Sequence, residues 1–179
     1  MGAWAGPFLV AALLLTAAGA LKAWDPTNTV GALRKARVPV APGLVRAGGV
    51  VEVVIGAAAI VTGAPVAAAL VALSYALFTA FVLYALVRHL PIGSCGCFGK
   101  VDTPPSAVHI VLNLGAIVVA TAVAVRGGGG VGDVLADQEL LGLPFLLFVA
   151  TATYLAFLAL TLLPQLRSLE THPHAEAGS

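Results

Sequence analysis

Charged residues are scarce in this chain. Only 9% of its 179 residues are Asp, Glu, Lys or Arg, whereas 60% are hydrophobic. A soluble globular domain carries charge on about a quarter of its residues, so this chain has too little charge to cover a surface that faces water. The apolar surface therefore faces lipid, and the bilayer is the first predicted partner. No basic patch with interleaved aromatic residues is present, so we predict no binding of nucleic acid.

Cysteine is also scarce, since the chain has only two, Cys95 and Cys97, separated by one glycine. A secreted domain stapled by disulfides would contain more cysteines, spread along the chain. Two thiols this close in the sequence instead indicate local redox chemistry or metal binding.

Five apolar runs are long enough to cross a bilayer, which takes about 20 helical residues. They are Trp4–Ala23, Leu44–Val61, Val66–Val87, Ala107–Val125 and Leu140–Leu163. None of these runs shows the alternation that is typical of barrel strands. The first run lacks the positive charge that precedes a signal peptide, so we expect it to be retained as a helix. The predicted fold is all-α: a polytopic transmembrane helix bundle with a four-helix core and a fifth helix.

Breaks in the apolar pattern divide the chain into four predicted parts. Residues 1–125 form the four-helix core, and residues 126–139 form a Gly-rich and acidic loop. Residues 140–163 form the additional transmembrane helix, and residues 164–179 form a flexible polar tail. Within the core, residues 29–38 favour a short amphipathic helix that lies on the lipid headgroups.

Two local signals refine these boundaries. Thr103 and Pro104 are typical of an N-cap residue and a first helical residue, so they predict where the fourth helix begins. The tetraglycine Gly127–Gly130 indicates a flexible connection.

Lysine and arginine segregate to one side of this predicted bundle. With five spans, the connection after the first run, the cysteine loop and the tail share a side, and together they hold eight of the nine basic residues. Only Arg126 falls on the other side. The positive-inside rule then predicts a multi-pass protein of the cell membrane, with the cysteine loop at the cytoplasmic face.

The polar loop Pro91–Ser106 contains the sequence Cys95-Gly96-Cys97. A disulfide between these cysteines would close a small, strained ring, and the central glycine gives the backbone the freedom that this ring needs. Strain makes a disulfide easy to reduce, so the pair suits thiol–disulfide exchange. Lys100 and the positive end of the following helix favour the thiolate, which is the attacking species.

Metal binding is the alternative use of these thiols. His89, Cys95, Cys97 and His109 would together supply two nitrogens and two sulfurs. Such a set suits tetrahedral zinc or a soft copper site, although the spacing of the cysteines is tighter than in a usual zinc knuckle.

Glu52 lies inside the second apolar run, a few residues from the end that faces the cysteine loop. A carboxylate at this depth is costly, and it indicates either a functional group or a structural ion pair with Lys22, Arg46 or Arg88. As a functional group, Glu52 would carry the proton that thiol exchange with a disulfide or a quinone must move. We therefore predict Glu52 and the two cysteines as the catalytic residues.

Other polar and aromatic residues have simpler interpretations. His109 and Asn113 share one helix face, which favours hydrogen bonds between helices. Lys22 ends the first run, where a lysine usually extends to the headgroups. Trp4 and Trp24 flank the first run, as interfacial anchors do.

Three features of the chain occur together. They are Ala18-Gly19-Ala20-Leu21-Lys22 followed by Asp25-Pro26, the intramembrane Glu52, and Cys95-Gly96-Cys97-Phe98-Gly99. Over residues 5–125 the chain resembles the MauE family of methylamine-utilisation membrane proteins, within a wider DoxX-like group. The resemblance implies a four-helix membrane protein that acts with a thioredoxin-like partner in disulfide handling during maturation of a periplasmic dehydrogenase. The matching residues are Cys95 and Cys97, with Glu52 and Lys22 as further matches.

Three functional hypotheses follow. The first is an integral membrane thiol–disulfide redox protein whose cysteines exchange electrons with a thioredoxin-like partner or a quinone, and which supports the maturation of another protein. Such a protein would be an oxidoreductase, with a quinone as its candidate cofactor. The second is a zinc- or copper-binding membrane protein, and the third is a non-catalytic assembly factor.

Overall fold

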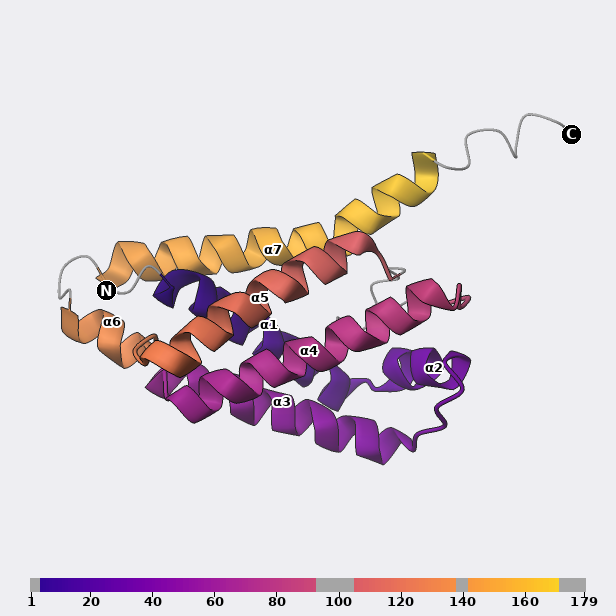
Figure 1. Cartoon of the computed structure of the whole chain (residues 1–179), viewed down its shortest axis with the longest axis horizontal. Coiled ribbons are helices and arrows are strands. Elements are labelled where there is room, and N and C mark those ends of the chain that lie inside the picture. The colour runs from indigo at the N-terminus through magenta and orange to yellow at the C-terminus, as the bar shows by residue number, and fades with distance from the viewer. Residues whose placement is uncertain (1–3, 93–104, 138–141, 171–179) are drawn as a thin grey trace, which may run out of the picture.

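The computed structural model describes residues 4–92, 105–137 and 142–170 (Figure 1). Every helix or strand assigned in these residues is an α-helix, which confirms the all-α prediction. The helices of the described residues are α1 (Ala5–Trp24), α2 (Thr27–Lys35), α3 (Pro42–Thr62), α4 (Pro65–Val87), α5 (Ala107–Arg126), α6 (Val131–Asp137) and α7 (Gly142–Glu170).

Among the described residues, α1, α3, α4, α5 and α7 are long and apolar enough to cross a bilayer. The predicted polytopic bundle with a fifth long helix is therefore confirmed. Prolines at the first helical position begin α3 and α4, where a missing N–H costs nothing. Gly63 ends α3 in the left-handed conformation (φ 56°), which lets the chain turn at once into α4.

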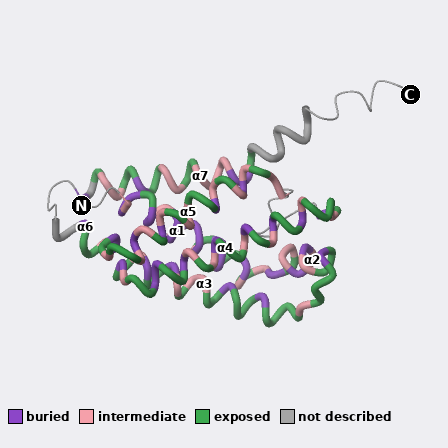
Figure 2. Tube along the Cα trace, in the orientation of Figure 1, coloured by how far each residue is buried: buried purple, intermediate pink, exposed green. Residues whose placement is uncertain are grey.

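The long helices lie side by side, with α1 at the centre (Figure 1). More than half of the most apolar part of α1 is buried (56%), against at most 33% for the other four helices. The largest buried cluster joins α1 to α4 and α5 through Phe8, Leu15, Val71 and Val123. Buried segments face inward and exposed segments line the outside (Figure 2). Exposed aliphatic side chains on a membrane bundle are its lipid-facing surface.

The two ends of the bundle differ in charge. The carboxyl ends of α1 and α4, the amino ends of α3 and α5, and all of α2 lie at one end (Figure 1). The exposed basic residues at this end, called the basic end below, are Arg34, Lys35, Arg37, Arg46 and Arg88. Arg126 ends α5 at the opposite end, where its guanidinium lies 5.7 Å from the centre of the Trp4 ring. Trp24 is 86% exposed at the basic end, so the two tryptophans flank α1 as predicted.

The predicted start of the fourth long helix is wrong. Thr103 and Pro104 lie outside the described residues, but Pro105 and Ser106 are not helical and α5 begins only at Ala107. Ser106 occupies the N-cap position instead, with extended backbone angles.

The tetraglycine is packed into the fold rather than being a flexible connection. Gly129 and Gly130 are buried, and both donate their backbone N–H groups to the carboxylate of Asp133, at 3.1 and 3.3 Å. Gly63 lies so close to them that it has no room for a side chain. The segment predicted as a loop also contains a helix, α6.

The predicted amphipathic helix is present as α2, slightly earlier in the chain than expected. The carboxylate of Asp25 accepts hydrogen bonds from the backbone N–H and the hydroxyl of Thr27, the first residue of α2. Val30 and Ala32 are buried, and Ala32 packs against Ala85 of α4. Helix α2 therefore covers the space between α3 and α4 at the basic end.

Candidate functional site

Two glycines bring α1 and α3 into backbone contact. A Cβ atom on Gly19 would lie 2.6 Å from the carbonyl oxygen of Gly49, and one on Gly49 would lie 2.6 Å from that of Gly19. Real Cβ atoms do not approach this closely, so only glycine fits at both positions. Close approach of this kind is how small residues pack membrane helices.

The charged residues of the site pack against these glycines, each on the glycine of the other helix. A Cβ atom on Gly19 would lie 2.8 Å from Cβ of Glu52, and one on Gly49 would lie 3.1 Å from Cβ of Lys22. Lys22 follows Gly19 by three residues, and Glu52 follows Gly49 by three, so each lies on the face that the crossing brings together. The Lys22 Nζ atom lies 2.6 Å from Oε1 and 2.5 Å from Oε2 of Glu52. The side chains are only 7% and 17% exposed, so the ion pair is formed inside the bundle.

This geometry selects between the interpretations of both residues. Lys22 points into the bundle rather than out to the headgroups, so the predicted extension of its side chain is wrong. Lys22 points inward because the Glu52 carboxylate gives its ammonium a partner at hydrogen-bonding distance. Arg46 and Arg88 are exposed, whereas Lys22 is the partner that Glu52 contacts.

An aromatic ring covers the other side of the ammonium. The Lys22 Nζ atom lies 4.3 Å from the centre of the Phe78 ring on α4, within the range of a cation–π contact. Oε1 of Glu52 accepts a hydrogen bond from Lys22, and Oε2 contacts the same ammonium but has no other donor among the residues that the structure describes. The carboxylate therefore retains acceptor capacity for a further group.

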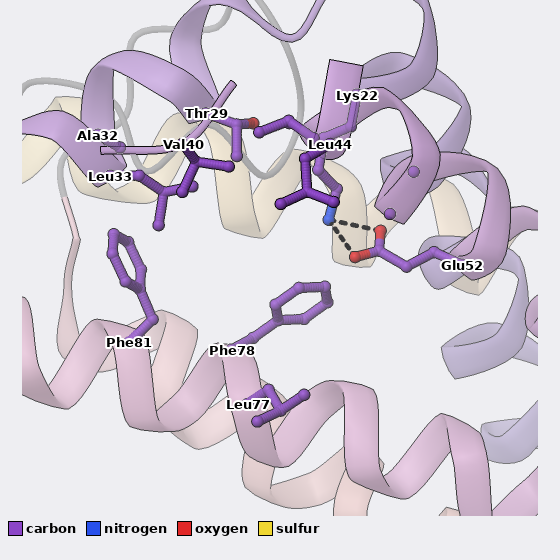
Figure 3. Close-up of a pocket in the computed structure, with 13 residues that line it drawn as sticks. Lys22, Thr29, Ala32, Leu33, Val40, Leu44, Glu52, Leu77, Phe78 and Phe81 are labelled. Carbon is purple, nitrogen blue, oxygen red and sulfur yellow. Dashed lines mark hydrogen bonds and ion pairs between the residues drawn. The ribbon is translucent and has the colours of Figure 1, made fainter. Parts of the chain in front are cut away.

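The ion pair lies in the wall of a cavity of about 300 Å³. Figure 3 shows Lys22 and Glu52 on one side of this space, with Phe78 and Phe81 rising from α4 on the opposite side. Helix α2 and the start of α3 supply most of the remaining lining, which includes Thr29, Ala32, Leu33, Val40, Leu44 and Gly48. Apart from the ion pair and the Thr29 hydroxyl, these side chains are apolar. We call this space the α1–α4 pocket.

A second polar group lies deeper in the bundle. His109 and Asn113 are 2% and 8% exposed on α5, which places the predicted polar face of that helix inside the protein. Nδ1 of His109 lies 2.9 Å from the hydroxyl of Ser106. Both residues line a cavity of about 20 Å³ together with Tyr75 and Phe78. Phe78 therefore stands between this polar group and the Lys22–Glu52 pair.

The predicted thiol site can be placed only by its connections. Cys95 and Cys97 lie outside the described residues, but the loop that contains them joins α4 to α5 at the basic end. His89, the proposed metal ligand after α4, is exposed and has φ 47°. Among the described residues no group of three or more His, Cys, Asp or Glu side chains is arranged to hold a metal ion. The metal-binding set remains a prediction, because two of its members lie in the undescribed loop.

The family model of the methylamine utilisation protein MauE matches residues 1–126. The chain belongs to the MauE family. The match covers the four long helices α1, α3, α4 and α5, and with them the Lys22–Glu52 pair and the cysteine loop. Searches of curated proteins and of solved structures found no match. This MauE-family chain is therefore a multi-pass membrane protein linked to methylamine utilisation, with α7 lying beyond the matched region.

Sequence reasoning identified Glu52 and a set of possible partners but missed the pocket. The pattern Gly-x-x-Lys at residues 19–22 and Gly-x-x-Glu at residues 49–52 was the available signal, since both charges follow a small residue on the same face. No comparable signal marks Phe78 and Phe81, which look like ordinary apolar residues of a membrane helix.

Proposed function

We propose that this protein is a membrane thiol–disulfide redox protein that supports the maturation of another protein. The observation that carries the proposal is the Cys95-Gly96-Cys97 pair, placed by the chain between two helix ends at the basic end of the bundle. Membership of the MauE family supports a role in the maturation steps of methylamine utilisation. The resemblance to the wider DoxX-like group is part of the same proposal.

In the proposed reaction the two thiols become one disulfide. Two S–H bonds break, one S–S bond forms, and two protons and two electrons leave. A thioredoxin-like partner in its disulfide form accepts both electrons and both protons and becomes a dithiol, and the reverse transfer reduces the pair again. Attack by a thiolate is the chemical step, so protons must move as electrons do.

The Lys22–Glu52 pair supports this chemistry as a proton-handling group. A carboxylate held inside the bundle can take up or release a proton while the ammonium beside it holds its position. Intramembrane ionisable residues commonly mark proton pathways, because their burial is too costly to be incidental. In the proposal, Cys95 and Cys97 exchange electrons, and Glu52 serves the accompanying proton transfer.

The experiment traps the redox state of the cysteines. Cells that produce the full chain are quenched in acid, and free thiols are alkylated with a mass-tagged maleimide before and after reduction. We expect part of the protein to take no tag before reduction and two tags after it. In Cys95→Ser or Cys97→Ser, reduction should not change the number of tags. The control is a variant that lacks both cysteines and carries Ala41→Cys, an exposed position at the basic end, which should take one tag under both conditions.

Two results would contradict the redox proposal. One is a pair of thiols that stays free under oxidising and reducing growth conditions alike. The other is a Cys95→Ala, Cys97→Ala double variant that still supports full maturation of the partner, which would favour an assembly factor. Stoichiometric zinc or copper in the purified protein, with both thiols reduced, would favour the metal-binding alternative.

A further inference from the structure

The α1–α4 pocket is closed on the inside by charge and open on the outside to lipid. Lys22 and Glu52 form its inner wall and are nearly buried, whereas Leu44 and Leu77 at its rim are 66% and 62% exposed. Gly48, also at the rim, is exposed and adds no side chain to narrow the opening. Because the rim residues belong to membrane-spanning helices, a ligand would enter from the bilayer rather than from water.

The charge in the pocket selects a neutral ligand. An anion in the pocket would be attracted by Lys22 but repelled by the neighbouring Glu52, and a cation would be attracted by Glu52 but repelled by Lys22. A lipid acyl chain would be neutral, but it would leave the remaining hydrogen-bonding capacity of the ammonium and the carboxylate, beyond their bond to each other, facing hydrocarbon, which is costly. The ligand therefore combines an apolar body with a group that can accept a hydrogen bond from Lys22 or donate one to Glu52.

The shape of the pocket favours a flat ring. Phe78 and Phe81 lie on one face of α4, opposite the ion pair (Figure 3). Aromatic side chains pack well against flat rings by offset or edge contact. The volume of about 300 Å³ lies at the lower end of the range for small-molecule sites, about 300–1,000 Å³.

We propose that the α1–α4 pocket binds the head ring of a lipid-soluble para-quinone. One quinone carbonyl accepts a hydrogen bond from the Lys22 ammonium, and the ring lies against Phe78 and Phe81. Oε2 of Glu52 accepts a hydrogen bond from the hydroxyl after reduction. The isoprenoid tail leaves between α3 and α4, past Gly48 and Leu77, into the bilayer.

This inference rests on the proposed function for its electron source, since the dithiol supplies what the quinone takes. Oxidation of the two thiols to one disulfide releases two electrons and two protons. Reduction of the quinone consumes the same two electrons and two protons, forming two O–H bonds and leaving a quinol. No other oxidant is required.

The test measures binding separately from redox chemistry. The full chain carrying Cys95→Ser and Cys97→Ser is placed in lipid nanodiscs and photolabelled with an azido-ubiquinone, with decylubiquinone as competitor. We expect competitor-sensitive labelling on α3 or α4 peptides that line the pocket. Gly48→Leu should reduce this labelling at least tenfold, whereas Gly43→Leu, on the same helix but away from the pocket, should leave it unchanged. Neither glycine has any atom near the position of an added Cβ, so both variants should fold.

A second pair of variants, on α4, tests whether a loss of labelling comes from a blocked pocket or from misfolding. Leu77→Trp at the rim should also block labelling, and Leu73→Trp, one turn earlier on α4 and equally open to lipid, should not. Labelling that persists in both blocking variants would overturn the proposal. So would labelling confined to other helices, or native mass spectrometry that shows a phospholipid in the pocket that quinone does not displace.

The two proposals can fail independently. If Gly48→Leu leaves thiol exchange with a thioredoxin-like protein intact and no quinone labels the pocket, the quinone site is wrong and the redox function stands. If the pocket binds quinone but the cysteines never cycle, the redox function is wrong and the site stands.

Discussion

At the scale of single residues, the Lys22–Glu52 pair is the most expensive feature of the described structure. Removing an ammonium and a carboxylate from water costs several kcal/mol per ion, and their attraction repays this only with close geometry. Here both carboxylate oxygens lie within 2.6 Å of the ammonium. A buried pair of this kind is weak evidence for stability, so its presence points to chemistry rather than to folding.

Substitution of one residue of the ion pair should therefore lower the free energy of unfolding more than substitution of both. We expect Lys22→Met or Glu52→Leu alone to lower the free energy of unfolding by about 3–5 kcal/mol, because each leaves an uncompensated charge in the bundle. The double variant should recover most of this loss while losing redox function. Equilibrium unfolding of the wild type, both single variants and the double variant in detergent makes this comparison. Arg46→Met, at an exposed position, is the control. Simple additivity of the two single losses would show that the pair does not interact as described.

At the scale of helices, the crossing of α1 and α3 decides whether the site exists. The contact between Gly19 and Gly49 sets the separation of the two backbones. Glu52 then packs against Gly19 and Lys22 against Gly49, so the two charged side chains meet at the crossing itself. Helix α4 is held less closely against α3, which leaves the α1–α4 pocket between them under the cover of α2. Helix α7 packs on α1 through Phe145 and Val149 and also contacts α5, away from this pocket.

Neighbouring glycines on α3 should respond in opposite ways to alanine. Gly49→Ala would place a methyl group 2.6 Å from the Gly19 carbonyl oxygen, so we expect a loss of about 1–3 kcal/mol from overpacking. Gly48→Ala meets nothing within 4 Å and should be neutral or stabilising by up to about 1 kcal/mol, as alanine favours the helix. Thermal unfolding of the two variants in one detergent makes the comparison. Equal stability of Gly49→Ala and Gly48→Ala would mean that the helices do not cross at these residues.

At the scale of the whole molecule, the five long helices alternate in direction and the basic residues gather at one end. Helix α2, which lines the α1–α4 pocket, lies at this end, as do the ends of α4 and α5 that the cysteine loop joins (Figure 1). The positive-inside rule predicts that this end faces the cytoplasm. Under the proposed function, a cytoplasmic thioredoxin-like partner would then exchange electrons with the cysteines directly.

Labelling with an impermeant maleimide on intact cells should test this orientation. In a variant that lacks both native cysteines, Ala41→Cys at the basic end should be protected and Gly128→Cys at the opposite end should react. Native Cys97 should behave like Ala41→Cys. Reaction of both engineered cysteines in sealed cells would mean that one of the long helices does not span. Reaction of Ala41→Cys alone would invert the topology and place the thiols on the outer side.

How much the sequence determined can be judged from particular residues. The scarcity of charge and the five apolar runs fixed the class and the helices, because hydropathy and length alone decide which segments can cross a bilayer. Prolines and glycines placed most helix ends within two residues. The resemblance to the MauE family, drawn from the end of the first run, Glu52 and the cysteine motif together, is confirmed. The position of Glu52 within an apolar run predicted a functional role or an ion pair, because burying a carboxylate is costly whichever residue is its partner.

Only the tertiary structure decided what surrounds these residues. The partner of Glu52 could have been any of several basic residues near one membrane face, and the glycine crossing of α1 and α3 selected Lys22 by bringing it within 2.6 Å. The packing of Gly129 and Gly130 against Gly63, and the pocket lined by Phe78 and Phe81, likewise depend on contacts between distant segments. Such contacts depend on how helices approach one another in three dimensions, whereas a linear pattern of apolar residues records only that they are buried or face lipid.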